Sequence, residues 1–345
     1  MPIPIIMLNW NGLDDTIECV EALRVQSASD FALVLYDNGS DNDEASRLER
    51  RFRDEPRVEI RRFERNHGFT GGMNRAMTEV LEQIPGDYLV LLNNDTIPAP
   101  DWLEHLLAAA ADADCVASRL VRHDNPEVLD NAGHIMLNTG EIMPRGAGRP
   151  ARDYDQPAEL IGACAGAALY RQSMLKDIGL FDDFFGSGYE DAELGLRAYQ
   201  AGYTIRYAPR AVVRHKVSQS VDKIRTEAYA IKIQRDIEYT YFKLVPIAVM
   251  ITNLPFTLAR IVLVPLVALL VGRVTLARVQ WKALRQTLAD RDLILSARRA
   301  AGPYRRRPAT QLLRAQRFFL GTYLSYFRRY VVGRKATVFE RRRSS

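Results

Sequence analysis

The chain has 345 residues, of which 47% are hydrophobic and 26% charged, and only three cysteines; this composition excludes a collagen, a disordered polar chain and a disulfide scaffold. The net charge of +5 is divided unevenly, since residues 1–215 hold 21 Lys and Arg against 35 Asp and Glu, whereas residues 216–345 hold 26 against 7. A division this large predicts two parts of the chain with different partners.

The first 215 residues alternate between predicted strands and predicted helices. Short apolar runs indicate buried strands, and the amphipathic segments between them indicate helices. In chain order, strands and helices alternate over Ile3–Leu8, Thr16–Val25, Phe31–Tyr36, Ala45–Arg53, Val58–Phe63, Gly71–Glu82, Tyr88–Leu92 and Trp102–Ala111. This order predicts an α/β fold with an open, mostly parallel sheet flanked by helices.

Polar clusters follow the first two strands. Asn9 and Asn11 come directly after the first strand, and Asp37-Asn38-Gly39-Ser40 closes the second. Ligands of open α/β sheets bind beyond the carboxyl ends of the strands, where a carboxylate such as Asp37 can accept hydrogen bonds from a base or a ribose. An Asx turn that closes the strand also explains these residues.

A glycine-rich loop runs from Asn66 to Asn74 and leads into the third helix. Its glycines allow the backbone to approach a ligand, and the helix start that follows can hold an anionic group. A plain helix cap is the alternative interpretation.

The fourth strand ends in Asn93-Asn94-Asp95, and His215 follows a later short strand predicted over Ala211–Arg214. Carboxylate and amide oxygens suit Mg²⁺ or Mn²⁺ that bridges phosphate oxygens, although a turn before Pro98 is an alternative. A lone histidine is usually structural, but beside a metal site it becomes a candidate ligand.

Two acidic residues, Glu190 and Asp191, precede a helix predicted over Ala192–Ala201. Because they follow glycines and aromatic residues, one of them is suited to act as the general base of a sugar-binding cleft. The alternative is a pair of carboxylates that stabilises the start of the helix through its dipole.

These segments, in this order, resemble the family 2 glycosyltransferases, and in particular their rhamnosyltransferase-like branch. The resemblance covers the first 215 residues, and the family consists of inverting enzymes with the GT-A fold. The matching strings are Asn9-Trp10-Asn11-Gly12, Asp37-Asn38-Gly39-Ser40, Asn66-x-Gly68-x-x-Gly71-Gly72-x-Asn74, Leu91-Leu92-Asn93-Asn94-Asp95-Thr96-x-Pro98, Gly162-Ala163-Cys164 and Tyr189-Glu190-Asp191-Ala192-Glu193-Leu194-x-x-Arg197.

The resemblance implies a nucleoside-diphosphate sugar as donor, linked to dTDP or UDP, and the branch suggests rhamnose as the sugar. Asp37 is expected to hold the base or the ribose. The other residues expected in the donor site are Asn9, Asn11, Asn66, Gly71, Asn74, Asn93 and Asn94. The implied acceptor is a lipid-linked or cell-surface glycan, as in the synthesis of cell-envelope polysaccharides.

The resemblance also implies a divalent cation, Mg²⁺ or Mn²⁺, and a catalytic base. Asp95 matches the metal ligand of the family's aspartate-x-aspartate motif, and Asn93 replaces the first aspartate of that motif. His215 matches a histidine that completes the metal shell in some members. Asp191 is the expected base, with Glu190 as the alternative. The base deprotonates the acceptor hydroxyl, which displaces the nucleoside diphosphate and inverts the anomeric carbon.

The second part of the chain is predicted to associate with a membrane. A helix predicted over Tyr229–Lys243 leads into the most apolar stretch, Leu244–Gly272, whose only formal charge is Arg260. The stretch either crosses the bilayer once or enters and returns as a hairpin broken by its prolines; we favour the hairpin, because it keeps the basic flank cytoplasmic. We therefore expect residues 1–225, 226–272 and 273–345 to form a catalytic domain, a membrane-inserting segment and a basic tail at the inner face of the cytoplasmic membrane.

The basic tail, residues 273–345, holds 19 Lys and Arg against 3 Asp and Glu. Helical patterns over Val274–Arg298 and Gln311–Val332 combine basic with Leu and aromatic residues, which is typical of helices in the interface of anionic membranes. Packing of these helices against the rest of the protein is an alternative. Nucleic-acid binding is not expected, because the apolar stretch explains the basic flank better.

Two other functions compete with a transferase. A non-catalytic membrane scaffold with a degenerate transferase domain is opposed by the presence of Asp95, Asp191 and His215. A nucleotidyltransferase normally has a basic, Gly-rich loop after its first strand, and Asn9–Gly12 offers none. The segment Gly133–Arg149 has no predicted role, and the oligomeric state is left open.

Overall fold

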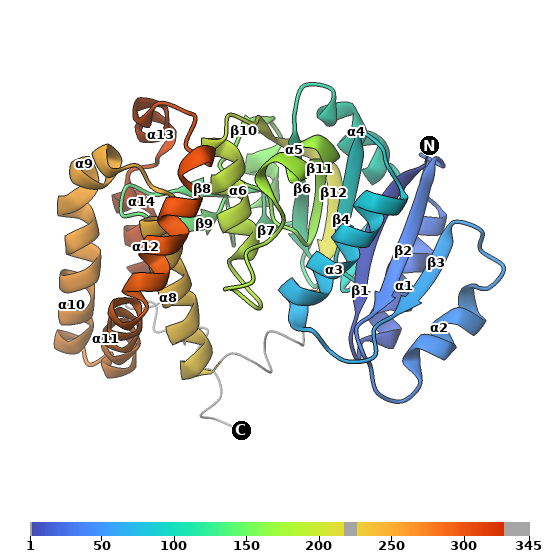
Figure 1. The fold of residues 1–345 in the computed structure, drawn as a ribbon, viewed down its shortest axis with the longest axis horizontal. Helices are drawn as coiled ribbons and strands as arrows, with labels where there is room; N and C mark the ends of the chain where they lie inside the picture. The colour runs from blue at the N-terminus through green and yellow to red at the C-terminus, as the bar shows by residue number, and fades with distance from the viewer. Residues whose placement is uncertain (1, 217–225, 328–345) are drawn as a thin grey trace. The chain divides into compact units, whose positions relative to one another are not determined.

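The computed structural model describes residues 2–216 and 226–327 of the chain. The chain forms two compact units, one made of Met1–His134 and Pro144–Ser218 and the other of Ile135–Met143 and Gln219–Ser345 (Figure 1). The tip of the segment Gly133–Arg149, which had no predicted role, therefore belongs to the second unit, while both of its ends belong to the first. The predicted division at residues 225 and 272 stays a prediction.

The first unit is built on one mixed sheet. Within the described residues the sheet has ten strands in the order β10-β12-β6-β11-β4-β1-β2-β3, with β5 paired to β12 and β7 paired to β6. The strands are β1 (Ile3–Asn9), β2 (Phe31–Asp37), β3 (Val58–Arg62), β4 (Tyr88–Leu92), β5 (Thr96–Pro98), β6 (Cys115–Arg122), β7 (Leu129–Asn131), β10 (Ala158–Glu159), β11 (Ala167–Arg171) and β12 (Ile205–His215). A separate pair, β8 (His134–Met136) and β9 (Ile142–Pro144), forms a small two-stranded sheet.

The centre of the sheet is parallel, as predicted. Strands β3, β2, β1 and β4 pair in parallel, as do β6 and β12, whereas β11 runs antiparallel between β4 and β6. The central strands are almost wholly apolar and buried because helices cover both faces of such a sheet. Their carboxyl ends meet at one edge, where Asn9, Asp37 and Asn93 follow.

Five of the described helices of the first unit lie close to predicted segments, whereas the helix Gln172–Ile178 and the 3₁₀ helix Ala151–Tyr154 were not predicted. The described helices are α1 (Leu13–Arg24), α2 (Glu44–Phe52), α3 (Gly68–Gln83), α4 (Trp102–Ala110), α5 (Gln172–Ile178), α6 (Glu190–Gln200) and the short 3₁₀ helix Ala151–Tyr154. Helix α3 begins three residues before the predicted Gly71. Strand β12 is much longer than the predicted Ala211–Arg214, because a bulge between Ala208 and Val212 accommodates Pro209 without ending the strand.

The second unit is helical. Its helices are α8 (Glu227–Leu244), α9 (Ile247–Leu258), a π turn (Ala259–Leu263), α10 (Val264–Leu270), α11 (Val274–Ala289), α12 (Arg291–Ala300), a 3₁₀ turn (Gly302–Tyr304), α13 (Ala309–Ala315) and α14 (Phe319–Phe327). Each of the two helices predicted in the tail is in fact two, and the first breaks at Asp290. Residues 328–332 of the second prediction lie outside the described part of the chain.

The predicted hairpin within Leu244–Gly272 is wrong. Residues Ile247–Leu270 form one helix of 24 residues, and among the described residues it is the one helix long and apolar enough to cross a membrane. Pro255 and Pro265 do not end it: α9 and α10 follow one another without a break (Figure 1), joined by the π turn Ala259–Leu263.

Candidate functional site

Asn9 and Asp37 are joined at the carboxyl ends of β1 and β2. The Asn9 Nδ2 donates to Asp37 Oδ1 at 2.9 Å, and the backbone N–H of Ser40 donates to the other carboxylate oxygen at 3.0 Å. Asn9 Oδ1 accepts from the Thr16 hydroxyl at 2.8 Å. Both Asn9 and Asp37 are buried, so the Asp37 carboxylate is held in a fixed position at the sheet edge. The geometry is consistent with an Asx turn and with a ligand site at the same residue.

Asn11 joins the loops that follow β1 and β2. Its Nδ2 donates to Asp41 Oδ2 at 3.1 Å, its Oδ1 accepts from the Asp41 N–H at 2.8 Å, and its own N–H donates to the Ser40 hydroxyl. The residue adopts a φ of 50°, a left-handed conformation that asparagine tolerates better than most residues. Asn11 therefore fixes the rim beside Asp37.

Asn66 belongs to the same edge through Asn38. The Asn38 Nδ2 donates to Asn66 Oδ1 at 3.2 Å and to the carbonyl of Gly68 at 3.0 Å. A Cβ on Gly72 would lie 3.0 Å from the Asn38 amide, whereas one on Gly71 would meet only an ordinary contact at 3.6 Å. The close packing of α3 against this edge therefore depends on Gly72, which is the second glycine of the predicted pair.

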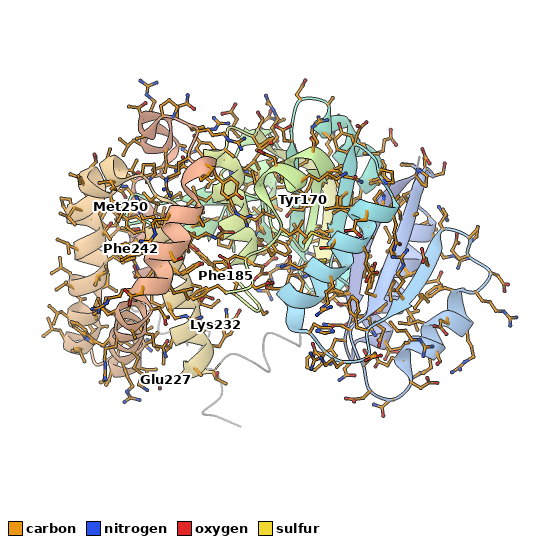
Figure 2. All side chains as sticks on the ribbon, in the orientation of Figure 1. Tyr170, Phe185, Glu227, Lys232, Phe242 and Met250 are labelled. Atoms are coloured by element: carbon orange, nitrogen blue, oxygen red, sulfur yellow. The ribbon has the colours of Figure 1, made fainter. Side chains whose placement is uncertain are left out.

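The Asn74 side chain is hydrogen-bonded to the segment 181–183. Its Nδ2 donates to the Phe181 carbonyl and to Asp183 Oδ1, both at 2.9 Å, and its Oδ1 accepts from the Phe181 N–H. The amide thus ties α3 to the loop that leads to α6. In that loop Phe185 is fully buried and meets Phe184 edge to face at 5.6 Å (Figure 2).

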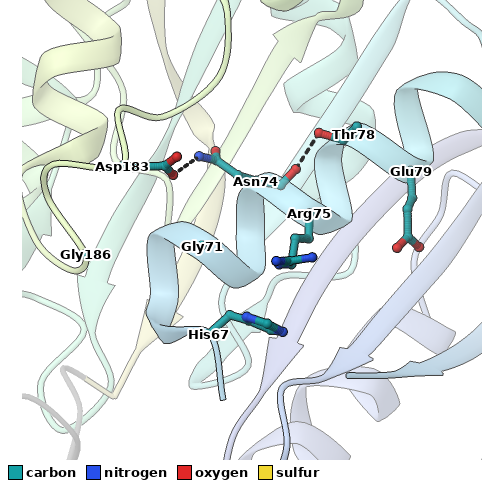
Figure 3. Close-up of a pocket in the computed structure, with 8 residues that line it drawn as sticks. All are labelled: His67, Gly71, Asn74, Arg75, Thr78, Glu79, Asp183 and Gly186. Atoms are coloured by element: carbon teal, nitrogen blue, oxygen red, sulfur yellow. Dashed lines mark hydrogen bonds between the residues drawn. The ribbon is translucent and has the colours of Figure 1, made fainter. Parts of the chain in front are cut away.

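Helix α3 and this loop enclose a cavity of about 590 Å³ (Figure 3). It is lined by His67, Gly71, Asn74, Arg75, Thr78, Glu79, Asp183 and Gly186. Of the residues predicted for the donor site, only Gly71 and Asn74 line it. The structure therefore divides the predicted donor residues between the sheet edge and the outer face of α3.

The residues after β4 connect the sheet edge to the segment 164–166. The Asn93 N–H donates to the Gly166 carbonyl at 2.9 Å, and a Cβ on Gly166 would lie 3.4 Å from the Asn93 amide. Asn94 donates to the Thr16 hydroxyl at 2.9 Å. Asn94 thereby binds the first turn of α1, while Asn93 faces the segment that contains Cys164.

Asp95, His215 and Asp130 form one cluster. His215 Nδ1 lies 2.8 Å from Asp130 Oδ2, and its Nε2 lies 3.4 Å from Asp95 Oδ1. The sheet sets this register, because β5 pairs with β12 so that His215 lies opposite Thr96, and the Lys216 N–H donates to the Asp95 carbonyl at 3.0 Å. The cluster thus comes from β7, β12 and the turn between β4 and β5, which are distant in sequence.

The carboxylates of Asp130 and Asp95 raise the pKa of His215. Burial lowers the pKa of this imidazole, but its contacts with Asp130 and Asp95 outweigh burial and raise the pKa to about 10. Without a cation the ring is therefore an imidazolium at neutral pH, and a metal that binds Nε2 must displace a proton.

The cluster fits a divalent cation in part. Neighbouring ligands of an octahedral Mg²⁺ lie about 3 Å apart, which is close to the 3.4 Å between Asp95 Oδ1 and His215 Nε2. Asp130 is placed as the outer partner that orients a ligating histidine. Because the described residues contain no group of three or more His, Cys, Asp or Glu arranged as metal ligands, the remaining positions would fall to phosphate oxygens and water.

Asp191 lies in the first turn of α6 and is fixed through its backbone neighbours. Its Oδ2 accepts from the Ala165 N–H at 3.1 Å, and its Oδ1 accepts from the Ala192 N–H at 2.8 Å. His134 Nε2 lies 3.8 Å from Asp191 Oδ2. The Asp191 side chain is 17% exposed, whereas Glu190 is buried, so Asp191 is the better placed of the two to meet a substrate.

Helix α6 approaches the segment before Cys164 without room for a side chain. A Cβ on Gly195 would lie 2.4 Å from the Gly162 Cα. On the inner side of α6, Arg197 pairs with Glu193 at 2.6 Å and donates to the carbonyl of Ile178. These contacts fix α6, the helix that carries Asp191, against Gly162 and against the carbonyl of Ile178.

Cys164 lies between the two acidic clusters. Burial raises the pKa of its thiol well above the ordinary value, and the carboxylates of Asp191, Asp130 and Glu190 raise it further. The thiol therefore stays neutral. The segment 164–166 contacts Asn93, two residues before the predicted metal ligand Asp95, and it also contacts the predicted base Asp191.

Sequence reasoning missed Asp130 and His134. Both lie near the start of the segment that had no predicted role, and neither belongs to a recognised string. His134 is buried, its Nδ1 has no hydrogen-bond partner among the described residues, and burial lowers its pKa while Asp191 opposes that effect. The signal available in the sequence was Asp130-Asn131-x-Gly133, a turn-like string similar to the one that begins at Asp37.

Two family models match the chain. The one described as "Glycosyl transferase family 2" matches residues 5–179, and the one described as "Glycosyl transferase family group 2" matches residues 154–291. Together they cover every residue of the clusters just described.

Among curated proteins, the chain is 32% identical over 155 residues to the pre-mycofactocin glycosyltransferase of Mycobacterium tuberculosis; the match covers 44% of the chain and 31% of that protein. The chain thus spans less than a third of this relative. It is 23% identical over 245 residues to the N-acetylglucosaminyl-diphospho-decaprenol L-rhamnosyltransferase of the same species, over 64% of the chain and 78% of the relative.

Among solved structures, a mannosyltransferase of Pyrobaculum calidifontis in complex with GDP-Man and Mn²⁺ matches with a TM-score of 0.55. The match covers 98% of the chain and 84% of that structure at 16% identity. At this identity the likeness concerns the fold alone.

Proposed function

The chain belongs to family 2 of the glycosyl transferases, and we propose that it is an inverting enzyme that transfers a sugar from a nucleoside diphosphate to a lipid-linked or cell-surface glycan at the cytoplasmic face of a membrane. The observation that carries this proposal is that the segment 164–166 contacts both motifs: the Gly166 carbonyl accepts from Asn93 of the string Asn93-Asn94-Asp95, and the Ala165 N–H donates to Asp191. A cation ligand and a proton acceptor are the two groups that such a transfer requires.

Asp95 and His215 are the residues that would hold a divalent cation, which supplies positive charge for the departing diphosphate when it is bound. Asp130 orients His215 through Nδ1. This arrangement supports Mg²⁺ or Mn²⁺ as the cofactor, with one protein carboxylate in place of two because Asn93 occupies the other motif position.

Asp191 is proposed to accept the proton of the acceptor hydroxyl. The Ala165 N–H holds Oδ2 and the Ala192 N–H holds Oδ1, so the carboxylate keeps its orientation while the proton arrives. The hydroxyl oxygen then bonds to the anomeric carbon as the bond to the nucleoside diphosphate breaks. A positioned general base of this kind contributes about 10²–10⁴-fold to the rate.

The donor and acceptor follow from the relatives. One relative is named as a rhamnosyltransferase that acts on a diphospho-decaprenol-linked sugar, which supports rhamnose and a lipid-linked acceptor for this chain. We propose a dTDP- or UDP-linked donor held by Asp37, Asn9 and Asn11 at the sheet edge. Attachment to anionic lipids is proposed from the excess of 19 Lys and Arg over 3 Asp and Glu in residues 273–345.

The proposal is tested by sugar transfer with Asp191→Asn, measured beside the surface control Asp101→Asn. We expect the turnover of Asp191→Asn to fall about 10²–10⁴-fold while the affinity for the nucleoside-diphosphate donor is unchanged, because the base does not hold the donor. Transfer by Asp191→Asn at the rate of the control would refute the assignment. A wild-type chain that neither transfers nor hydrolyses any nucleotide sugar, with or without Mn²⁺, would support the alternative of a non-catalytic scaffold.

A further inference from the structure

The helix Ile247–Leu270 exposes a wide apolar face. Apolar side chains that are between 43% and 86% exposed follow one another along its length; they are Ile251, Leu254, Leu258, Leu263, Leu266 and Leu270, among others. The one hydrophilic side chain on this face is Thr252, and its hydroxyl donates to the Ala248 carbonyl at 2.9 Å. Monomeric soluble proteins rarely expose an apolar face of this extent.

The opposite face of the same helix is polar and buried. Arg260 donates to both carboxylate oxygens of Glu238 in α8, at 2.7 and 2.9 Å, and to the Thr139 carbonyl at 3.1 Å. Thr257 meets the Tyr241 hydroxyl at 3.2 Å. Because Arg260 and Glu238 are both almost fully buried, the ion pair depends on the helix remaining packed against α8.

A further polar contact on the buried face lies nearer the start of the helix, where the Asn253 Nδ2 donates to Gln316 Oε1 at 2.9 Å. The π turn keeps the two halves of the helix in phase, so that Val249, Asn253, Thr257, Arg260 and Ala268 all lie on the buried side. The helix therefore exposes an apolar face, and its polar side chains other than Thr252 lie on the opposite, buried face.

The helices packed beside it are too charged to enter hydrocarbon with it. Helix α11 packs against both α10 and α8, and its Arg278 and Lys282 are half exposed and paired with Glu227 of α8. A charged side chain is costly to place at the centre of a bilayer. Crossing the membrane would therefore require the helix to leave α8 and α11 and to separate Arg260 from Glu238.

We propose that the helix Ile247–Leu270 does not cross the membrane but lies along the surface of an anionic bilayer, with only its apolar face in one leaflet. This inference rests on the proposed membrane association and replaces both the single crossing and the hairpin predicted from sequence. The charge of the chain favours an anionic bilayer as the partner of this face, because residues 273–345 carry 19 Lys and Arg against 3 Asp and Glu.

The test is the immersion depth of nitroxide labels on the full-length protein bound to vesicles of phosphatidylcholine with phosphatidylglycerol. Single cysteines replace Ile251, Leu258 and Leu266 on a Cys164→Ser background, because Cys19 and Cys115 are buried. Arg291→Cys, on an exposed and charged position, is the control that should stay in water. Depth is read from the accessibility of each label to oxygen and to a nickel chelate.

We expect the three helix labels to lie at one depth, about 5–10 Å below the headgroups. A crossing helix would place the label at position 258 about 10 Å deeper than both others, since seven residues of helix span about 10 Å, and this result would overturn the proposal. Labels that remain in water on every vesicle would also overturn it. Binding should weaken at least about tenfold without phosphatidylglycerol.

Transfer to a detergent-dispersed acceptor, measured on the unlabelled wild-type protein, separates this inference from the proposed function. An active wild type whose labelled variants show a crossing or aqueous depth profile would refute the in-plane arrangement alone. An inactive wild type whose labelled variants show equal depths would refute the transferase proposal alone.

Discussion

The proposed base, the proposed metal ligands and their neighbours each lie on a different strand, turn or helix. They are Asp191, Asp95, His215, Asp130 and His134. Sequence strings singled out Asp95 and Asp191, and the family resemblance added His215. They did not single out Asp130 or His134, since the pairing that brings these two residues to the site is tertiary and leaves no periodic trace. The amides of Asn74 and Asn94, expected in the donor site, donate to the Phe181 carbonyl and to the Thr16 hydroxyl of α1, and their role toward the donor stays a prediction.

Asp130 should matter through His215. Replacing Asp130 with Asn removes the carboxylate that fixes the His215 ring, so the affinity for Mn²⁺ in the presence of a nucleoside diphosphate should fall about 10–100-fold. Titration calorimetry measures this affinity, and Asp124→Asn, on an exposed residue paired with Arg122, is the matched control. Unchanged Mn²⁺ affinity in Asp130→Asn would remove this residue from the site.

His134 should make the first unit sensitive to acid. Burial holds the pKa of His134 below its ordinary 6.5, so the folded state binds fewer protons than the unfolded chain in mildly acidic solution. The stabilisation is complete above pH 6.5 and is lost as the pH falls through the lowered folded-state pKa, with a limiting slope of about 1.4 kcal/mol per pH unit. Denaturant unfolding from pH 7.5 to 5 measures this slope.

The slope in His134→Asn should be flatter than in the wild type, whatever the variant's stability at neutral pH. His123→Asn, which removes an exposed imidazole, serves as the control and should keep the wild-type slope. Equal slopes in all three proteins would show that His134 does not titrate on unfolding.

At the scale of helices and strands, regular periodicity was the reliable guide. The strands β1, β2 and β4 were predicted almost to the residue, because buried parallel strands are continuous apolar runs. Strand β3 was also predicted to within one residue, although its sequence, VEIRR, is only partly apolar. The prolines of the apolar stretch suggested a hairpin, whereas the helix continues through Pro255 and Pro265 by way of a π turn; β12 is longer than predicted and contains a bulge between Ala208 and Val212.

The buried pair of Arg260 and Glu238 should be more costly to break than to replace. Arg260→Met leaves the Glu238 carboxylate buried without its partner and should destabilise the second unit by about 3–5 kcal/mol, whereas the double replacement Arg260→Met with Glu238→Met should cost less than either single change. Hydrogen exchange of the α8 and α9 amides measures the local opening. A double variant that opens as readily as the two single effects added together would contradict the pairing.

At the scale of the whole chain, composition predicted two parts with different partners, and the structure has two compact units. Charge could not predict that Ile135–Met143, an insertion in the first unit's sequence, belongs to the second unit. There Asn138 accepts from the Phe319 N–H at 3.0 Å and Thr139 accepts from Arg260. These contacts join residues far apart in sequence, which local patterns do not record.

The central claim is that Asp95 and His215 hold a cation on the donor diphosphate beside the base Asp191. Anomalous diffraction from crystals grown with Mn²⁺ and a nucleoside diphosphate tests it most directly. The account predicts one Mn²⁺ peak at about 2.0–2.2 Å from a carboxylate oxygen of Asp95 and from Nε2 of His215, in contact with a phosphate oxygen. A peak in the cavity beside Arg75, or at Asp191 and Glu190 without Asp95, would contradict it.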